Sequence, residues 1–340
     1  MGQQREGAGM TTAAVIGCGD VSVVHFEAIE ALDGSELVAV CDVDPDTAAR
    51  AGERYGVPSF AGHSELLTAL RPDVVHIATP HDQHVQPAID CLAAGVNVVV
   101  EKPVAHTPGE AERLVAAAEQ PGAPKIAVCY QNRYNATSQA IVDLLASGEL
   151  GSVIGGSATV CWSRRPAYYE SRPWRGRLER SGGGVLINQA IHTVDLLQWL
   201  LGEVTDVRGR ASRLAIDGID VEDTAQIVLD HRGGARSVFF ATNANATDSP
   251  VTLEIVTEGA ELFLRRDLTV QYADGRVEVV RERQAASGGR AYWGISHRLL
   301  IADFYARLVE PEPFWIGPRE AAKSLDILSR VYASGIWTAS

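Results

Sequence analysis

The chain has 340 residues, of which 46% are hydrophobic and 21% charged, an ordinary composition for a soluble globular protein. Its formal net charge of −13 argues against binding to nucleic acid or to anionic membranes, because both require a basic face. This length favours two domains, and no apolar run approaches the roughly 18 residues of a membrane span.

The start of the chain and the cysteines indicate the cellular compartment of the protein. Residues 1–11 are polar and glycine-rich, without the apolar core of a signal peptide, and we expect them to form a disordered extension. The five cysteines include no C-x-x-C pair. This pattern predicts a reduced, cytoplasmic protein without a metal site.

The first third of the chain alternates short apolar strands with helices. Continuous apolar strands separated by helices indicate a parallel sheet that is covered on both faces. We therefore predict an α/β Rossmann domain, with a doubly wound parallel sheet, over residues 12–124. Its expected strands are 12–16, 37–41, 57–60, 74–78 and 98–100, with a further strand at 126–129 just past the boundary, and its expected helices are 20–32, 44–55, 64–70, 83–94 and 108–119.

After residue 124 the pattern changes to runs of strands joined by short turns. Turns such as 232–234 and 273–275 suit hairpins. We predict an α+β domain with a largely antiparallel, open sheet over residues 125–340. Helices are expected at 135–147, 296–308 and 318–334, and strands at 153–162, 207–214, 224–229, 235–241, 251–256, 260–264 and 269–272.

A glycine loop follows the first predicted strand. Gly17 and Gly19 allow a tight turn and a close backbone approach to a pyrophosphate, and Asp20 and Val21 open the next helix, whose N-terminus favours an anion. Ser22 replaces the third glycine of the dinucleotide fingerprint, at a position that tolerates small residues. The loop predicts a dinucleotide site, and a Rossmann-like scaffold without a nucleotide is the alternative.

An acidic residue after the second strand bears on the choice of cofactor. Asp42 ends that strand, where a carboxylate would bind the ribose hydroxyls of the adenosine and repel a 2′-phosphate. Val43 follows it, so no arginine is present there to receive the phosphate. The sequence therefore predicts NAD, with NADP less favoured.

Polar residues also follow the fourth and fifth strands. Thr79 and Pro80 are expected to line the nicotinamide ribose, and His84, in the first turn of the next helix, is also expected among the cofactor-binding residues. For a single histidine there, a contact with the helix terminus is a simpler interpretation than catalysis. Glu101 and Lys102 directly follow the fifth strand, at the edge where open α/β sheets bind their ligands. We expect both to contact the cofactor, and Lys102 to handle a proton.

A glycine run at 182–184 opens a strongly apolar segment that carries three polar residues. Asn188, His192 and Asp195 are spaced four and three residues apart, so on a helix they project from one face. Buried polar groups need partners, so this face contacts either a ligand or a polar neighbour. An isolated histidine would be read as a satisfied core residue, but beside Lys102 and a nucleotide site His192 is a catalytic candidate. Asp195 either orients His192 or makes another polar contact.

The stretch 161–176 is dense in aromatic residues and arginines. Tyr168, Trp174 and Arg175 can stack on a sugar face and bind hydroxyls, a carboxylate or a phosphate. The alternative is an ordered loop that packs on a neighbouring subunit. Arg133, after the sixth strand, is also expected near the cleft.

These motifs together resemble the glucose–fructose oxidoreductase/inositol dehydrogenase/rhizopine catabolism (Gfo/Idh/MocA) family, over nearly the whole chain from about residue 12. The resemblance implies that Lys102 and His192 are active-site residues, and that the open sheet forms a homodimer or homotetramer. The family often has aspartate where this chain has Asn188; the change removes one candidate base and favours action at C3 of a sugar or nucleotide sugar. The carriers are Gly17-Cys18-Gly19, Val40-Cys41-Asp42, Ala78-Thr79-Pro80 with His84, Glu101-Lys102-Pro103, and Gly182-Gly183-Gly184 with His192 and Asp195.

We therefore expect an NAD-dependent oxidoreductase that interconverts a secondary alcohol and a ketone on a sugar, inositol or sugar derivative. His192 would take the hydroxyl proton, and Lys102 would hold the oxygen. Two alternatives stay open: a reductase of a non-sugar compound such as a dihydrodiol or tetrapyrrole, and a non-catalytic NAD-sensing regulator. The expected substrate-binding residues are Lys102, Arg133, Tyr168, Trp174, Arg175, Asn188 and His192.

Overall fold

The computed structural model describes residues 10–283 and 295–338. The extension expected at 1–11 lies outside these residues except at its end, where the first strand begins at Thr11. Two compact units emerge from the internal contacts, and each is described by itself. Unit 1 runs to Lys102 and adds Glu112–Cys129 and His297–Pro318, whereas unit 2 takes Pro103–Ala111, Tyr130–Ser296 and the chain from Arg319.

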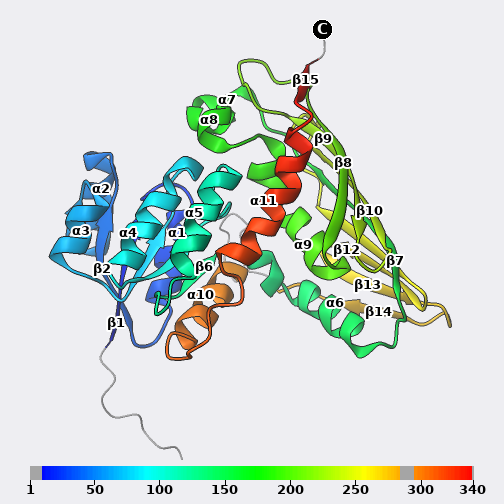
Figure 1. Cartoon of the computed structure of the whole chain (residues 1–340), viewed down its shortest axis with the longest axis horizontal. Helices are drawn as coiled ribbons and strands as arrows, with labels where there is room; N and C mark the ends of the chain where they lie inside the picture. The colour runs from blue at the N-terminus through cyan, green and yellow to red at the C-terminus, as the bar shows by residue number, and fades with distance from the viewer. Residues whose placement is uncertain (1–9, 284–294, 339–340) are drawn as a thin grey trace, which may run out of the picture. The chain divides into compact units, whose positions relative to one another are not determined.

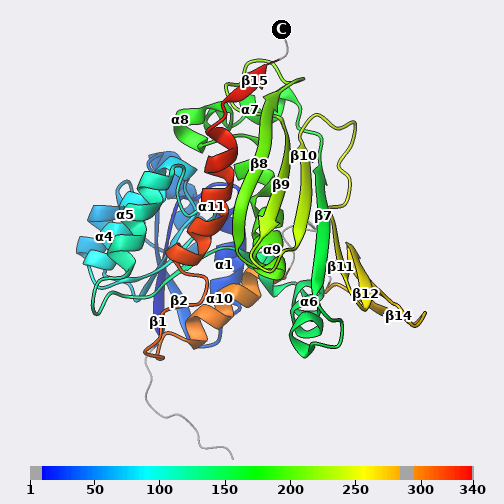
Figure 2. The same cartoon turned by 45° about the vertical axis from the view of Figure 1, so that its right-hand side comes forward.

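Unit 1 is built on a six-stranded sheet in the order β3-β2-β1-β4-β5-β6, in which every strand pair is parallel. Helices cover both faces, with α4 and α5 opposite α1 (Figures 1 and 2). The doubly wound parallel sheet expected from the sequence is therefore confirmed. Its strands are β1 (Thr11–Ile16), β2 (Ser35–Cys41), β3 (Ser59–Phe60), β4 (Val74–Ile77), β5 (Asn97–Val100) and β6 (Ile126–Val128), and its helices are α1 (Ser22–Glu30), α2 (Pro45–Tyr55), α3 (His63–Ala69), α4 (Val85–Ala93), α5 (Pro108–Ala118) and α10 (Ser296–Ala306).

One helix of this unit begins later than the sequence pattern suggests. The helix expected at 83–94 divides into a 3₁₀ turn, His81–Gln83, and α4 from Val85. Pro87 explains the break, because a proline has no N–H for the carbonyl four residues before it. With α4 beginning at Val85, Pro87 falls in the first turn, where an N–H would have no partner within the helix.

Unit 2 is built on a nine-stranded sheet in the order β14-β13-β12-β11-β7-β10-β9-β8-β15. Only the pairs β7–β10 and β8–β15 are parallel, so the largely antiparallel sheet is also confirmed. Two strands were not expected, the short β14 and β15. The strands are β7 (Val153–Cys161), β8 (Val204–Arg213), β9 (Thr224–His231), β10 (Arg236–Thr242), β11 (Thr252–Thr257), β12 (Ala260–Arg265), β13 (Asp267–Tyr272), β14 (Val277–Val280) and β15 (Ile336–Thr338).

Helices cover one face of this sheet and leave the other open. The helices α6 (Ala136–Ser147), α9 (Ile191–Leu201) and α11 (Pro318–Tyr332) lie on the same side (Figures 1 and 2). Strand β10 alternates accordingly, with Phe239 buried and Val238 and Phe240 exposed. Apolar side chains pointing away from the helices are expected on a sheet face that contacts a partner.

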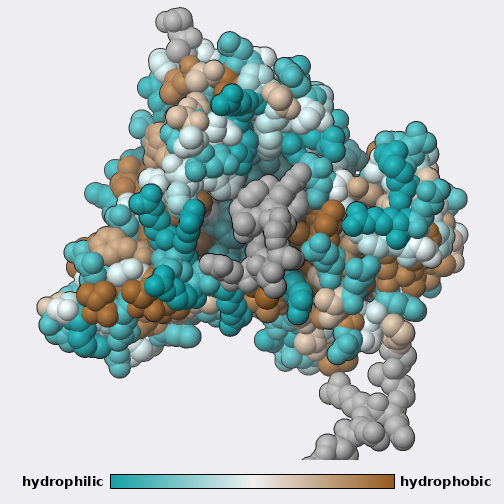
Figure 3. Space-filling view, turned by 180° about the vertical axis from the view of Figure 1, so that it is seen from behind, coloured by the Kyte–Doolittle hydropathy of each residue, from teal (hydrophilic) through white to brown (hydrophobic). Residues whose placement is uncertain are grey.

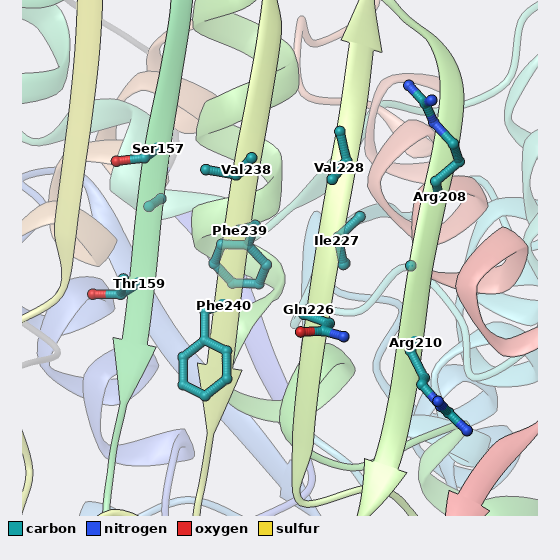
Figure 4. Close-up of a pocket in the computed structure, with 12 residues that line it drawn as sticks. Ser157, Thr159, Arg208, Arg210, Gln226, Ile227, Val228, Val238, Phe239 and Phe240 are labelled. Atoms are coloured by element: carbon teal, nitrogen blue, oxygen red, sulfur yellow. The ribbon is translucent and has the colours of Figure 1, made fainter.

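The open face is hollowed at its centre and hydrophobic at one edge. A hollow of about 570 Å³ lies over β7, β8, β9 and β10, where Thr159, Phe240, Gln226 and Arg210 follow one another across the sheet (Figure 4). Hydrophobic side chains gather at the lower left of Figure 3, where β12–β14 lie; Val277 and Val279 of β14 are at least half exposed. Among the described residues, no helix is long and apolar enough to cross a membrane.

Candidate functional site

The glycine loop of unit 1 has the geometry that a dinucleotide requires. Gly17 has φ +90°, and a Cβ there would lie 2.7 Å from the carbonyl atoms of Ala78, so any side chain would collide with the end of β4. A Cβ at Gly19 would meet nothing within 4 Å, which leaves its backbone open to a phosphate. Ser22 Oγ donates to the Gly19 carbonyl at 2.7 Å. This bond explains how serine serves at the third position of the fingerprint.

Asp42 joins the second strand to this loop. Its carboxylate accepts hydrogen bonds from the backbone N–H of Cys18 at 2.8 Å and of Asp44 at 2.9 Å. The neighbouring Val43 is 89% exposed and carries no positive charge. Asp20 is exposed and Val21 stands directly before α1, so the acid, the loop and the helix N-terminus fit a dinucleotide.

The loop after β4 presents two of its expected residues and buries the third. Thr79 and Pro80 are partly exposed at the carboxyl end of the strand. His84 is fully buried directly before α4, and its Nε2 lies 2.9 Å from the Thr79 carbonyl oxygen. His84 therefore supports the Thr79 loop from inside the protein, and its side chain makes no capping hydrogen bond to α4.

Glu101 is the centre of a buried hydrogen-bond network. Its Oε1 lies 3.0 Å from Nε2 of both His25 and His297. The network continues from His25 to His76 through their Nδ1 atoms at 2.9 Å, and from His76 Nε2 to the hydroxyl of Tyr305 at 2.9 Å. Glu101 is thereby fixed directly before the partly exposed Lys102.

The network changes the acidity of its members. Burial would raise the pKa of Glu101, but the charge of His297 and the hydrogen bonds from His25 and His297 hold it well below the ordinary value. Burial, with His25 adding to it, lowers the pKa of His76 well below 6.5. Burial and the Glu101 charge raise the pKa of the Cys129 thiol. The ligand atoms of His25, Glu101 and Cys129 lie within 4.8 Å of one another, and a hydrogen bond of 3.0 Å joins His25 to Glu101.

The glycine run of unit 2 starts the segment that carries His192. A Cβ at Gly182, Gly183 or Gly184 would collide with the His106 backbone, the Tyr332 ring or the Glu222 backbone, in that order.

The carboxylate of Glu222 caps this start. It accepts from the backbone N–H of Gly184 at 2.7 Å and of Leu186 at 2.9 Å, and from the Tyr332 hydroxyl at 2.8 Å. Burial raises the pKa of Glu222, and these hydrogen bonds oppose the rise.

The segment itself differs from the single helix that the sequence suggests. Leu186–Ala190 forms a π-helical turn, and α9 begins only at Ile191. From Gly183 to Gln198, only Asn188 and His192 are partly exposed, and every other residue is buried. The structure thus brings these two side chains together on one accessible side and turns Asp195 into the interior. π-Helical turns recur at functional sites.

Asp195 forms a buried ion pair with Arg133. The guanidinium donates to Asp195 at 2.8 and 2.6 Å and to Glu320 at 2.9 Å, and it lies over the Trp199 ring. Arg133 is 1% exposed. Arg133, expected among the substrate-binding residues, is therefore a buried ion-pair partner, because Asp195 and Glu320 draw it inward. Asp195 makes another polar contact, the second of the two possibilities.

His192 has a neighbour that the sequence analysis did not single out. Gln131 Nε2 lies 3.4 Å from His192 Nε2, and the Tyr130 ring packs edge-on against the imidazole. One signal could have revealed Gln131: it follows the sixth strand closely, as Lys102 follows the fifth and Thr79 the fourth.

The arginine- and aromatic-rich stretch is ordered by its own contacts. The Arg175 guanidinium lies 4.4 Å from the centre of the Tyr168 ring and 5.8 Å from that of Trp174. The Tyr168 hydroxyl accepts from Gln189 at 2.8 Å, which ties it to the turn that carries Asn188. The stretch contains α7 (Pro166–Glu170) and the 3₁₀ turn Pro173–Gly176, and α8 (Leu178–Ser181) follows it.

The site residues fall into two groups. Unit 1 gathers the glycine loop, Asp42, the Thr79 loop and Lys102 at the carboxyl ends of its strands. Unit 2 gathers Asn188 and His192 with Gln131, and joins Tyr168 to the same segment. A dinucleotide site and a polar site with a histidine are the parts of a redox enzyme.

Comparison with known proteins agrees with this chemistry. Residues 11–129 match the model of an oxidoreductase family with an NAD-binding Rossmann fold, and residues 138–262 match the C-terminal domain model of the same GFO/IDH/MocA family.

Individual relatives add detail. A D-apiose dehydrogenase from Paraburkholderia graminis is 33% identical over 78% of this chain and 68% of its own length. A putative UDP-kanosamine synthase oxidoreductase subunit from Amycolatopsis mediterranei is 32% identical over 88% of each chain. The crystal structure of the WlbA dehydrogenase from Bordetella pertussis, with NADH and UDP-GlcNAcA, is 30% identical over 96% of each chain, with a TM-score of 0.83.

Replacing His76 by phenylalanine should flatten the pH dependence of stability. Because its pKa is lowered in the folded protein, only the unfolded chain takes up a proton there as the pH falls from about 7 to 5. This residue therefore removes stability at up to about 1.4 kcal/mol per pH unit in that window. Urea unfolding at pH 7 and 5 measures the slope, with His63→Phe, at a partly exposed site, as control. Equal slopes for wild type and His76→Phe would contradict the assignment.

Proposed function

Because the chain belongs to the Gfo/Idh/MocA family of oxidoreductases, we propose that it interconverts a secondary alcohol and a ketone on a sugar, inositol or sugar derivative, with NAD as cofactor. Membership makes the chain a dehydrogenase or reductase acting on CH–OH groups. The observation that supports the finer assignment is the pairing of Asn188 and His192, the two partly exposed side chains of an otherwise buried segment.

His192 accepts the hydroxyl proton, and Lys102 stabilises the oxygen that loses it. Bound NAD supplies the hydride acceptor. The hydroxyl proton must leave as the hydride leaves carbon, and a neutral imidazole with a reference pKa of about 6.5 can accept it. The Lys102 ammonium can donate to the same oxygen and stabilise its developing charge. Arg133 and Asp195 keep α9, the helix that carries His192, in place and take no part in the proton transfer.

The cofactor preference rests on Asp42. A carboxylate at the end of β2 can accept hydrogen bonds from both ribose hydroxyls, whereas a 2′-phosphate would meet its negative charge. His84, buried behind Thr79, acts on cofactor binding through that loop.

The substrate class rests on the polar groups of unit 2. The Asn188 amide offers N–H donors and an acceptor oxygen for ring hydroxyls. The chain's resemblance to family members that have asparagine in place of aspartate favours oxidation at C3. Tyr168, Trp174 and Arg175 together offer aromatic faces and a positive charge, which suits a sugar that carries an anionic group. The UDP-linked sugar in the Bordetella pertussis structure is a ligand of this kind.

We propose that the open face of the nine-stranded sheet is the interface of a homodimer or homotetramer. Val238 and Phe240 are 49% and 39% exposed at its centre, and hydrophobic patches of this kind mark association surfaces.

Asp42→Ala should narrow the difference between NAD and NADP. We expect the unmutated protein to bind NAD at least about tenfold more tightly, equivalent to about 1.4 kcal/mol, and the variant to lose most of that preference. Calorimetric titration of both cofactors measures the ratio, with Asp46→Ala, in the exposed first turn of α2, as control. Equal affinities in the unmutated protein would overturn the assignment.

Lys102→Ala and His192→Ala should each lower kcat by at least about a hundredfold, the usual worth of a positioned acid or base. His192→Ala should leave NAD affinity nearly unchanged, because this residue belongs to unit 2. The rate should rise with pH through a group near neutrality, and this limb should vanish in the His192 variant. Steady-state NADH formation across pH 5–9 checks this, with His63→Ala as control. Near-normal turnover by His192→Ala would move the base elsewhere, with Tyr168 and Tyr169 as the next candidates.

Phe240→Glu should shift the protein toward a 36.4 kDa monomer. A charge in a desolvated interface costs several kcal/mol, whereas on a solvated face it costs little. Light scattering after gel filtration measures the mass, with Arg276→Glu, in an exposed turn, as control. A monomeric wild type would refute association through this face, whether as a dimer or as a tetramer.

A further inference from the structure

Gln131 is a buried amide that has unused hydrogen-bonding capacity beside His192. It opens the 3₁₀ turn Gln131–Tyr134 and is 5% exposed. Its Nε2 lies 3.4 Å from His192 Nε2, and its Oε1 is buried with no hydrogen-bond partner among the described residues. A buried amide oxygen without a partner is costly, so such a group is expected where a ligand hydroxyl completes the bonding. The unpartnered oxygen therefore indicates that the amide, including its N–H groups, faces a ligand.

The same ion pair holds Gln131 and His192 in place. Arg133 lies two residues after Gln131 on the 3₁₀ turn, and Asp195 lies three residues after His192 on α9. The two salt-bridge bonds of 2.8 and 2.6 Å therefore join the turn to the helix. The Arg133 N–H also donates to the Tyr130 carbonyl, which closes the turn. Relative motion of the amide and the imidazole is thereby restricted.

We propose that Gln131 donates a hydrogen bond to the substrate oxygen whose proton His192 takes. The inference rests on the proposed function. An oxygen at ordinary hydrogen-bond lengths of about 2.8 Å from the histidine Nε2 and about 2.9 Å from the amide nitrogen is compatible with two nitrogens that lie 3.4 Å apart. The amide N–H then points at the atom on which charge develops.

The reaction step balances around that oxygen. The C–H bond breaks and its electron pair leaves as hydride to the oxidised nicotinamide. The O–H bond breaks, its proton passes to His192 Nε2, and its electron pair forms the C=O bond. The oxygen carries extra negative charge if proton loss precedes hydride loss, and a fixed N–H donor stabilises it at that moment.

Two substitutions separate this role from a packing role. Gln131→Leu keeps most of the volume and removes the donor, so kcat should fall about a hundredfold while NAD affinity stays within about twofold. Gln131→Glu places a carboxylate beside the imidazolium, so the acid limb of the pH–rate profile should move up by about one pH unit. Gln120→Leu, at an exposed site, is the control. The probe substrate is whichever of D-apiose, myo-inositol and UDP-GlcNAcA the wild type oxidises.

A second measurement needs no substrate. The His192 imidazole can be titrated by NMR in labelled protein, with its signal identified by its loss in His192→Ala. Gln131→Glu should raise its pKa by about one unit, whereas a change in packing alone would lower the melting temperature without that shift. Near-normal turnover by Gln131→Leu, or an unshifted His192 titration in Gln131→Glu, would overturn the proposal. Full activity of His192→Ala would instead refute the base assignment, so the two failures are distinct.

Discussion

A carboxylate inside a protein must be hydrogen-bonded or neutralised, and Glu101 meets this requirement with two histidines from different helices. His25 of α1 and His297 of α10 both point at the same oxygen at 3.0 Å. The bonds draw both helices to the end of β5, and α1 begins at the glycine loop. The position of Lys102, the next residue, and the start of the pyrophosphate helix therefore depend on one buried charge.

Unit 2 also contains a buried carboxylate, Asp195, and an arginine rather than a pair of histidines neutralises it. Here the Arg133–Asp195 pair is structural, and it frees the accessible side of the helix for Asn188 and His192. Glu222 fixes the start of that segment by capping Gly184 and Leu186. Buried charges thus fix the segments that carry the candidate site residues in both units, while Lys102, Asn188 and His192 themselves stay partly exposed.

The strands and most helices could be predicted because their signal is local. The Val98–Val100 run and the glycine loop carry their structure in a few neighbouring residues. The π-helical turn at Leu186–Ala190 could not be predicted from local pattern. The glycine run before it packs against His106, Tyr332 and Glu222, which are far away in the sequence. The ion pair between Arg133 and Asp195 is equally long-range. The spacing of Asn188 and Asp195 predicts that they lie on one face of a helix, but it does not predict which partner each side chain binds.

The central claim is that this chain oxidises a secondary alcohol of a sugar or polyol with NAD. It is tested most directly by following NADH absorbance while the purified full-length protein is given NAD and a panel of aldoses, inositols, glycosides and UDP-sugars. The account predicts NADH formation with at least one member of the panel, and none when His192 is alanine. Tight NAD binding without turnover of any member, in either direction, would contradict it and favour a cofactor-sensing role.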